Sequence, residues 1–225
     1  MKGGRHLKPI YIVFSATPYK MGKFIRKMVG NRYNHVSISF KENLTPMFSF
    51  ARRHVNMPFY GGFVEETLSR YSPHGDSSEI KVCRLMTSDE QYEKIVSFVK
   101  HLRQTKSEYL YNLYSAFFTI FGVRLPIRKA YTCTEFVGDL LCVAGLAFPL
   151  GKFHSLARME RLLSPYTLYI GDSRGYLASL PKGHDDFFRK MPMLTGTIAT
   201  ADSLARLTVR GLHGAIHGVI HHHHS

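Results

Sequence analysis

The sequence predicts an α+β fold in which an antiparallel sheet packs against helices. Short apolar runs bounded by turn residues indicate strands, most of them in the first half of the 225-residue chain. One of these runs, residues 33–40, alternates strictly between apolar and polar side chains, as a strand with one apolar face does. Other segments carry apolar residues at helical spacing behind residues that cap helix N-termini.

Strands are expected at residues 10–14, 33–40, 47–50, 63–67, 80–85 and 167–170. A short turn separates residues 33–40 from 47–50, so these two should pair as a hairpin with Ser49 near His35. The last run ends at a Gly-Asp pair and is expected at an edge of the sheet.

Helices should fill much of the remaining chain. Residues 20–29 form a basic amphipathic pattern, typical of a surface helix with a solvated cationic side or of one that lies on an anionic membrane. The run Thr87-Ser88-Asp89-Glu90 predicts a capping box that opens a helix to about residue 102. The aromatic-rich residues 109–123 could form a lid, a membrane-facing segment or a buried helix, and burial is the default for aromatic side chains.

Two weaker helical patterns follow toward the C-terminus. Residues 154–163 are expected to form a short helix, and a terminal helix could be lined by Leu204, Leu207, Leu212 and Ile216. We therefore expect one domain over residues 1–181 and a C-terminal extension over residues 182–225.

Residues 131–141 predict a buried helix with a cysteine in its first turn. Thr132 can cap the helix with Glu135 three residues on, and Gly145 supplies the stop. Unpaired backbone N–H groups and the helix dipole at this end favour the thiolate of Cys133 and can hold an oxyanion. A free cysteine is more often a small core residue, so a nearby base must decide between the two interpretations.

His35 is the candidate base. A neighbouring imidazole generates the reactive thiolate and keeps a proton for the leaving group. A lone strand histidine is commonly an ordinary structural residue. Here, however, His35 follows Asn34 and shares a polar face with Ser37 and Ser39, which favours a place in a site.

Charge and cysteine usage restrict the partners and the compartment. A net charge of +14 and a pI near 9.8 favour an anionic partner such as a membrane surface, an acidic polymer or nucleic acid. Nucleic acid is the least favoured, because no nucleic-acid-reading motif is present. Three widely spaced cysteines indicate neither a disulfide framework nor zinc, and no motif predicts a metal or another cofactor.

A cytoplasmic protein, with membrane association left open, is the expected localisation. The apolar run at residues 9–14 is too short for a signal peptide, and no segment reaches the roughly 18 apolar residues of a spanning helix. The histidines at 221–224 resemble a purification tag and receive no functional weight. His213 and His217 have metal-ligand spacing but lack a third ligand in the sequence.

Two short motifs resemble a known family. Residues 33–38 (Tyr-Asn-His-Val-Ser-Ile), followed about a hundred residues later by 131–137 (Tyr-Thr-Cys-Thr-Glu-Phe-Val), are similar to the circularly permuted papain-like proteins. This is the permuted NlpC/P60 group, which includes the YiiX-like and lecithin retinol acyltransferase-like proteins. In that group the histidine strand precedes the cysteine helix, as here. The resemblance covers roughly residues 9–170.

The resemblance implies a catalytic role for Cys133 as nucleophile and His35 as general base, with the backbone N–H of Cys133 in the oxyanion hole. The family places a polar residue on the next strand to orient the imidazole, which points to Ser49 here. A carboxylate from the following strand, Glu65 or else Glu66, is the alternative. Asn34, Arg52 and Tyr131 are candidate substrate-binding residues.

The expected function is thiol-dependent hydrolysis or acyl transfer at an amide or ester bond of a peptide, cell-wall or lipid substrate, through an acyl-enzyme on Cys133. Two alternatives remain open. One is a non-catalytic binding module on the same fold, suggested by the lack of an obvious orienting carboxylate. The other is a basic protein that binds an anionic surface.

Overall fold

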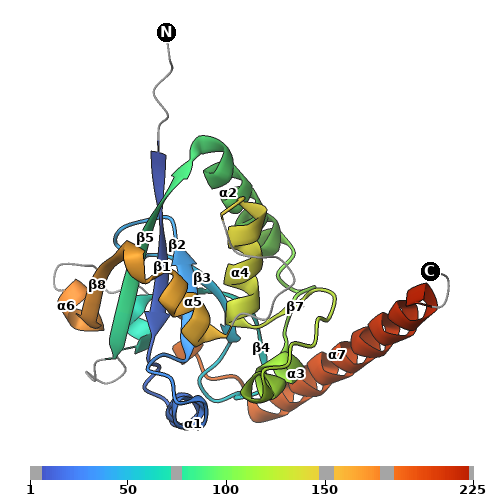
Figure 1. The fold of residues 1–225 in the computed structure, drawn as a ribbon. Coiled ribbons are helices and arrows are strands. Elements are labelled where there is room, and N and C mark those ends of the chain that lie inside the picture. The colour runs from blue at the N-terminus through green and yellow to red at the C-terminus, as the bar shows by residue number, and fades with distance from the viewer. Residues whose placement is uncertain (1–6, 72–77, 147–154, 178–184, 223–225) are drawn as a thin grey trace.

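A six-stranded antiparallel sheet with helices packed against it forms the body of the protein (Figure 1). The computed structural model describes residues 7–71, 78–146, 155–177 and 185–222. The strand order is β4-β3-β2-β1-β5-β8, and all five neighbouring pairs are antiparallel. The prediction of an α+β fold with an antiparallel sheet against helices is confirmed.

All six predicted strands are present, several of them longer than predicted. They are β1 (Leu7–Ser15), β2 (His35–Ser39), β3 (Met47–Arg52), β4 (Gly61–Glu66), β5 (Glu79–Ser88) and β8 (Thr167–Asp172). β2 and β3 form the expected hairpin, in which Ile38 pairs with Phe48 and Ser39 with Met47. Continued by one residue, this register sets Ser49 opposite Ser37 rather than beside His35.

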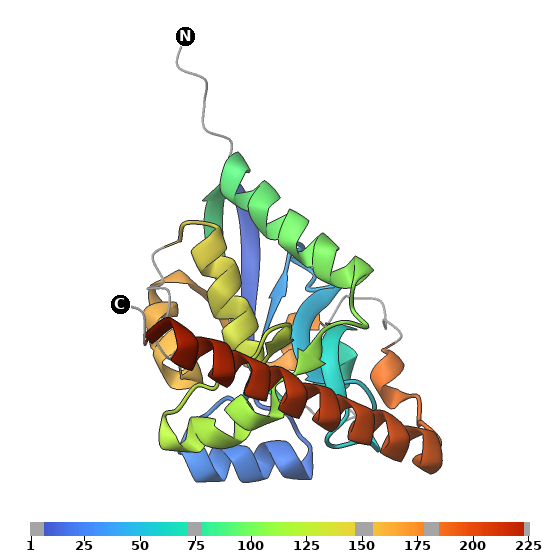
Figure 2. The ribbon, with the colours of Figure 1, turned by 90° about the vertical axis from the view of Figure 1, so that its right-hand side faces the viewer.

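Both faces of the sheet are covered. One apolar core joins Val36 and Ile38 of β2 to the helices α2 (Asp89–Gln104) and α4 (Cys133–Val143), which lie side by side in Figures 1 and 2. On the opposite face a second core gathers around the short helix η1 (Leu68–Tyr71). The alternation predicted for β2 is therefore real, and the polar face that carries His35 is buried rather than solvated.

The helix α2 begins one residue later than the predicted capping box. Its N-cap is Ser88, whose side chain accepts a hydrogen bond from the backbone N–H of Gln91. The Gln91 side chain in turn accepts one from the backbone N–H of Ser88. The residue before it, Thr87, still belongs to β5 and donates its hydroxyl to the carbonyl of Lys8 on β1. The capping box thus forms at Ser88, the last residue of β5, which still pairs with Leu7 of β1.

The aromatic segment is only partly buried. β6 (Leu110–Tyr111) pairs in parallel with β7 (Ala130–Tyr131), and α3 (Leu113–Phe118) and η3 (Thr119–Phe121) follow β6. Phe117 is 63% exposed and Phe121 is 69% exposed, so the default prediction of a buried helix is wrong for this side of the segment. The helix α1 (Lys20–Val29), which has the predicted bounds, lies at the same end of the molecule (Figure 2).

The described C-terminal elements are α5 (Leu156–Leu162), η4 (Ser164–Tyr166), α6 (Ser173–Leu177), η5 (Asp186–Phe188) and α7 (Met193–His222). The long helix α7 runs outward from the body (Figure 1). Of the four residues expected to line it, Leu207 is buried and Leu212 is exposed, because only part of the helix contacts the body. The Ile216 side chain lies outside the described residues. In the described part of the chain, no helix is both long and apolar enough to cross a bilayer.

Candidate active site

The first turn of α4 holds Cys133 in the predicted place. The Thr132 hydroxyl accepts a hydrogen bond from the N–H of Glu135, and the Glu135 carboxylate accepts one from the N–H of Thr132 at 2.7 Å. The same carboxylate accepts a bond from the Ser115 hydroxyl of α3 at 2.8 Å. The capping box is confirmed. It fixes the start of α4, so that the free N–H groups of the first turn lie around the Cys133 thiol. Cys133 is only 8% exposed.

A buried imidazole–carboxylate pair stands beside this thiol. His35 Nε2 lies 2.9 Å from Glu66 Oε1, and the Cys133 side chain interacts with the same imidazole through hydrogen bonding and charge. Because Glu66 occupies Nε2, Nδ1 is the ring nitrogen left to face the sulfur. The three side chains come from β2, β4 and α4, and all three are buried.

Electrostatics favours the charged form of the pair. Burial alone would lower the pKa of His35, but the Glu66 carboxylate and the Cys133 side chain outweigh it and raise that pKa to about 10. For Glu66 burial acts upward, whereas the charge of His35 and its hydrogen bond, with help from Arg70 and Tyr71, bring the pKa down to about 2. At neutral pH the pair is therefore an imidazolium–carboxylate ion pair. A cation next to sulfur is the environment that favours a thiolate.

Glu66, rather than Ser49 or Glu65, occupies the orienting position. The buried Ser49 hydroxyl donates to the carbonyl of Val36 at 2.7 Å. Glu65 points to the opposite side of β4 and accepts a hydrogen bond from Arg103 at 2.7 Å. The reason is the two-residue period of a strand, which sends neighbouring carboxylates to opposite faces. The sequence made both Glu65 and Glu66 candidates, but it does not show which face of β4 lies on the same side of the sheet as His35.

A second layer of charge holds Glu66 in place. Arg70 Nη1 donates to Glu66 Oε2 at 3.1 Å, and Arg70 also makes two hydrogen bonds to Asp185, at 2.8 and 3.1 Å. Asp185 accepts further bonds from the backbone N–H groups of Thr67 and Phe187. We call His35, Glu66, Arg70 and Asp185 the charge chain. The sequence analysis missed Arg70 and Asp185; the latter lies 115 residues from its arginine, and no local pattern connects them.

The thiol opens into two cavities. One, of about 160 Å³, is lined by Cys133, His35, Glu66 and Arg52 among others. The other, of about 420 Å³, extends from Cys133 and Thr132 between α1 and the α3–η3 segment. Tyr111 lines both cavities and interacts electrostatically with Cys133. Burial raises the pKa of Tyr111, so its hydroxyl is a neutral hydrogen-bond donor beside the thiol. It is a site residue that sequence analysis did not single out.

The predicted substrate-binding residues separate in the structure. Arg52 lines the smaller cavity. Asn34 also lines it, but its amide is engaged by Thr17, accepting from the backbone N–H at 2.8 Å and donating to the hydroxyl at 2.7 Å. Tyr131 packs against Phe50 at a ring-centroid distance of 5.1 Å and lines a different cavity. Asn34 thus shapes the turn before α1, and Tyr131 is part of an aromatic cluster.

Over the described ranges, no group of three or more histidine, cysteine or acidic side chains is placed to hold a metal ion. Comparison with protein-family models, with curated proteins and with solved structures found no match to this chain.

Proposed function

We propose that the protein is a cysteine-dependent hydrolase or acyltransferase that acts on an amide or ester bond through an acyl-enzyme. The observation that carries this proposal is the buried row Cys133–His35–Glu66, with 2.9 Å between His35 Nε2 and Glu66 Oε1. A nucleophile, a base and a group that orients the base are the parts that covalent acyl transfer needs.

Each part has a step in the proposed reaction. The Cys133 thiolate attacks the carbonyl carbon, and the oxyanion is held by the free N–H groups at the start of α4. His35 gives its Nδ1 proton to the leaving amine or alcohol, which departs as the acyl-enzyme forms. An acceptor then loses a proton to His35 and attacks the thioester. Water as acceptor gives hydrolysis, and another hydroxyl or amine gives acyl transfer.

We propose, further, that the fold is the circularly permuted papain-like fold. Its support is the order of the parts along the chain, with the histidine strand β2 before the cysteine helix α4, and the packing of α4 against β2 and β3. The carboxylate of Glu66 weakens the alternative of a non-catalytic module, which had been suggested by the lack of an orienting carboxylate.

Turnover of a panel of peptide amides, acyl esters and phospholipid esters tests the activity. Cys133→Ala should lower turnover at least about a thousandfold, and intact-protein mass spectrometry should detect an acyl adduct only when Cys133 is present. Cys142→Ala, nine residues further along α4, is the matched control and should keep activity. Full turnover by Cys133→Ala on every substrate that the wild type cleaves would refute the proposal.

Alkylation separates the enzyme from a binding module without a known substrate. In the enzyme, iodoacetamide should modify Cys133 at pH 6 much faster than it modifies a free model thiol. An equal rate would favour the non-catalytic module.

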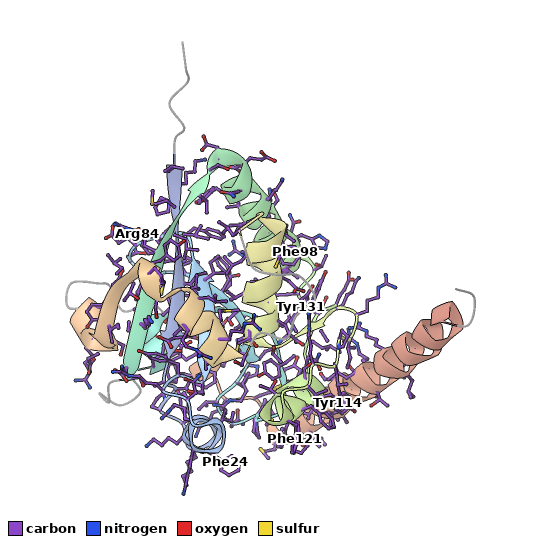
Figure 3. The ribbon with its side chains drawn as sticks, viewed as in Figure 1. Phe24, Arg84, Phe98, Tyr114, Phe121 and Tyr131 are labelled. Carbon is purple, nitrogen blue, oxygen red and sulfur yellow. The ribbon has the colours of Figure 1, made fainter. Side chains whose placement is uncertain are left out.

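An anionic membrane surface is the second part of the proposal, and one feature favours it. The side chains of Phe24, Phe117 and Phe121, which we call the aromatic rim, are 62%, 63% and 69% exposed. Their sequence neighbours Ile25, Ala116 and Gly122 line the larger cavity. Figure 3 places Phe24 and Phe121 at the same end of the molecule. Exposed lysines of α1, namely Lys20, Lys23 and Lys27, surround Phe24. Apolar side chains within a basic helix are typical of binding to an anionic bilayer.

Vesicle co-sedimentation tests this surface. Binding should require anionic lipid, and Phe24→Ser with Phe121→Ser should weaken it at least tenfold, because each phenylalanine can contribute about 1.5–3 kcal/mol on burial. Leu168→Ser, which removes an exposed apolar side chain from β8, is the control. Equal binding of the double variant and the wild type would rule out the rim as the docking surface.

A further inference from the structure

Arg52 is a partly buried cation in the wall of the cavity that contains the thiol. It ends β3, where it pairs with Gly61 of β4, and its side chain lines the 160 Å³ cavity together with Cys133 and His35. The cavity therefore has a nucleophile and a separate positive charge on its walls.

Two aromatic rings hold the guanidinium of Arg52. Its central carbon lies 5.3 Å from the ring centroid of Tyr19 and 5.4 Å from that of Phe187. The centroids of the two rings lie 5.2 Å apart. The Tyr19 hydroxyl donates a hydrogen bond to the carbonyl of Arg70 at 2.8 Å, which fixes the Tyr19 ring in place. Ring contacts of this kind orient the guanidinium without using its N–H donors.

The charge of Arg52 lacks the compensation that its neighbour has. Arg70 is ion-paired with both Glu66 and Asp185. In the part of the chain that the structure describes, no carboxylate forms an ion pair with Arg52. Burial and the nearby charge of Arg70 lower the pKa of Arg52, so its surroundings penalise the cation. A buried charge held at such a cost is compensated when an anion binds it.

We propose that Arg52 forms an anion-binding subsite that holds a carboxylate or phosphate group of the acyl substrate while the scissile carbonyl lies at Cys133. This inference rests on the proposed function and narrows its substrate class to acyl compounds that carry an oxyanion group near the reacting bond. The guanidinium fork matches the paired oxygens of either group.

Tyr111 lines the same cavity as Arg52 and Cys133. The Tyr111 phenol interacts electrostatically with both Cys133 and Arg52. Arg52 also interacts in this way with Tyr19 and Arg70. A substrate in this cavity can therefore present its anionic group to Arg52 and its carbonyl carbon to Cys133.

Alkylation of Cys133 by two reagents tests the subsite. Iodoacetate carries a carboxylate and iodoacetamide its neutral amide, so the ratio of their rates at Cys133, followed by peptide mass spectrometry, reports the attraction of an anion. Arg52→Gln should lower this ratio by about tenfold or more, as expected for loss of one hydrogen-bonded contact between charges. Arg53→Gln is the matched control, because Arg53 donates to the carbonyl of Lys106 and lines another cavity.

Each outcome has a distinct meaning. A ratio that is the same in Arg52→Gln and wild type overturns the subsite while leaving the proposed function intact. Equal slowing of both reagents also overturns the subsite, because the charge of Arg52 would then change the reactivity of the Cys133 thiol rather than attract the carboxylate of iodoacetate. A wild-type Cys133 that reacts with iodoacetamide no faster than a free thiol instead refutes the proposed function.

Protection identifies which oxyanion is preferred. Glutarate and glycerol phosphate should be tested for slowing the iodoacetamide reaction of wild-type Cys133. Protection by glutarate that is lost in Arg52→Gln indicates a carboxylate-bearing substrate, and protection by glycerol phosphate indicates a phosphate-bearing one. Protection by neither compound, with an unchanged rate ratio, overturns the subsite.

Discussion

The charge chain and the aromatic rim are two regions of one site with opposite organisation. In the charge chain, His35, Glu66, Arg70 and Asp185 are buried, and each has an oppositely charged partner within the chain. In the aromatic rim, the phenylalanine side chains face solvent. In the proposed function, the buried charge chain provides the geometry for the reaction, and the exposed aromatic rim would contact the membrane.

The largest expected effect tests the charge chain. Glu66→Gln keeps the shape of the side chain but removes the charge that orients His35, so activity should fall by about a thousandfold or more. Measured kcat/KM on any substrate that the wild type turns over checks this. Glu65→Gln is the control, since Glu65 pairs with Arg103 on the other face of β4 and should change activity little. Similar losses in both variants would mean that Glu66 has no special role.

The second effect concerns stability. Arg70→Met removes the cation between two buried carboxylates, and unpaired buried charge should lower the free energy of unfolding by about 3–5 kcal/mol. Urea denaturation measures this. Arg103→Met breaks an exposed ion pair and should cost less than about 1 kcal/mol. If the two variants lose equal stability, the burial of the charge chain has no energetic consequence.

The third effect is the pH dependence of the stability difference between wild type and Glu66→Gln. The folded pKa of His35 is raised from 6.5 to about 10, so its stabilising contribution is complete below pH 6.5 and is lost as the pH rises through 10. The folded pKa of Glu66 is lowered from 4.5 to about 2, so its contribution is complete above pH 4.5 and is lost as the pH falls through 2.

The difference should therefore be largest between pH 4.5 and 6.5 and should shrink toward pH 10, by at most about 1.4 kcal/mol per pH unit. Urea denaturation of both proteins at a series of pH values measures it. A difference that stays constant from pH 6.5 to 10 would show that His35 and Glu66 are not an ion pair.

The smallest effect tests the aromatic rim. Phe121→Ser should change the free energy of unfolding by no more than about 0.5 kcal/mol, because the side chain is mostly in water already. The substitution should have a larger effect only when vesicles are present, where it should weaken binding. A loss of several kcal/mol in the protein alone would mean that the phenylalanine belongs to the core.

Local patterns predicted the elements that carry the site, but not all of its contacts. The capping box around Cys133 and the alternation around His35 depend on residues a few positions apart, and both are present as predicted. The orienting carboxylate depends on which residue of β4 points to the same side of the sheet as His35, two strands away, so Glu65 and Glu66 could not be distinguished from the sequence. The exposure of Phe117 and Phe121 depends on how little of α3 and η3 the body covers, which aromatic composition cannot indicate.

The late position of Asp185 in the sequence determines when the site is completed during synthesis. His35, Glu66, Arg70 and Cys133 are all synthesised before it, yet Arg70 acquires its second carboxylate only when residue 185 is available to fold back. A nascent chain carries its nucleophile for some fifty residues of synthesis before the arginine behind Glu66 is fully held. Full assembly of the site therefore requires the synthesis of the segment around residue 185.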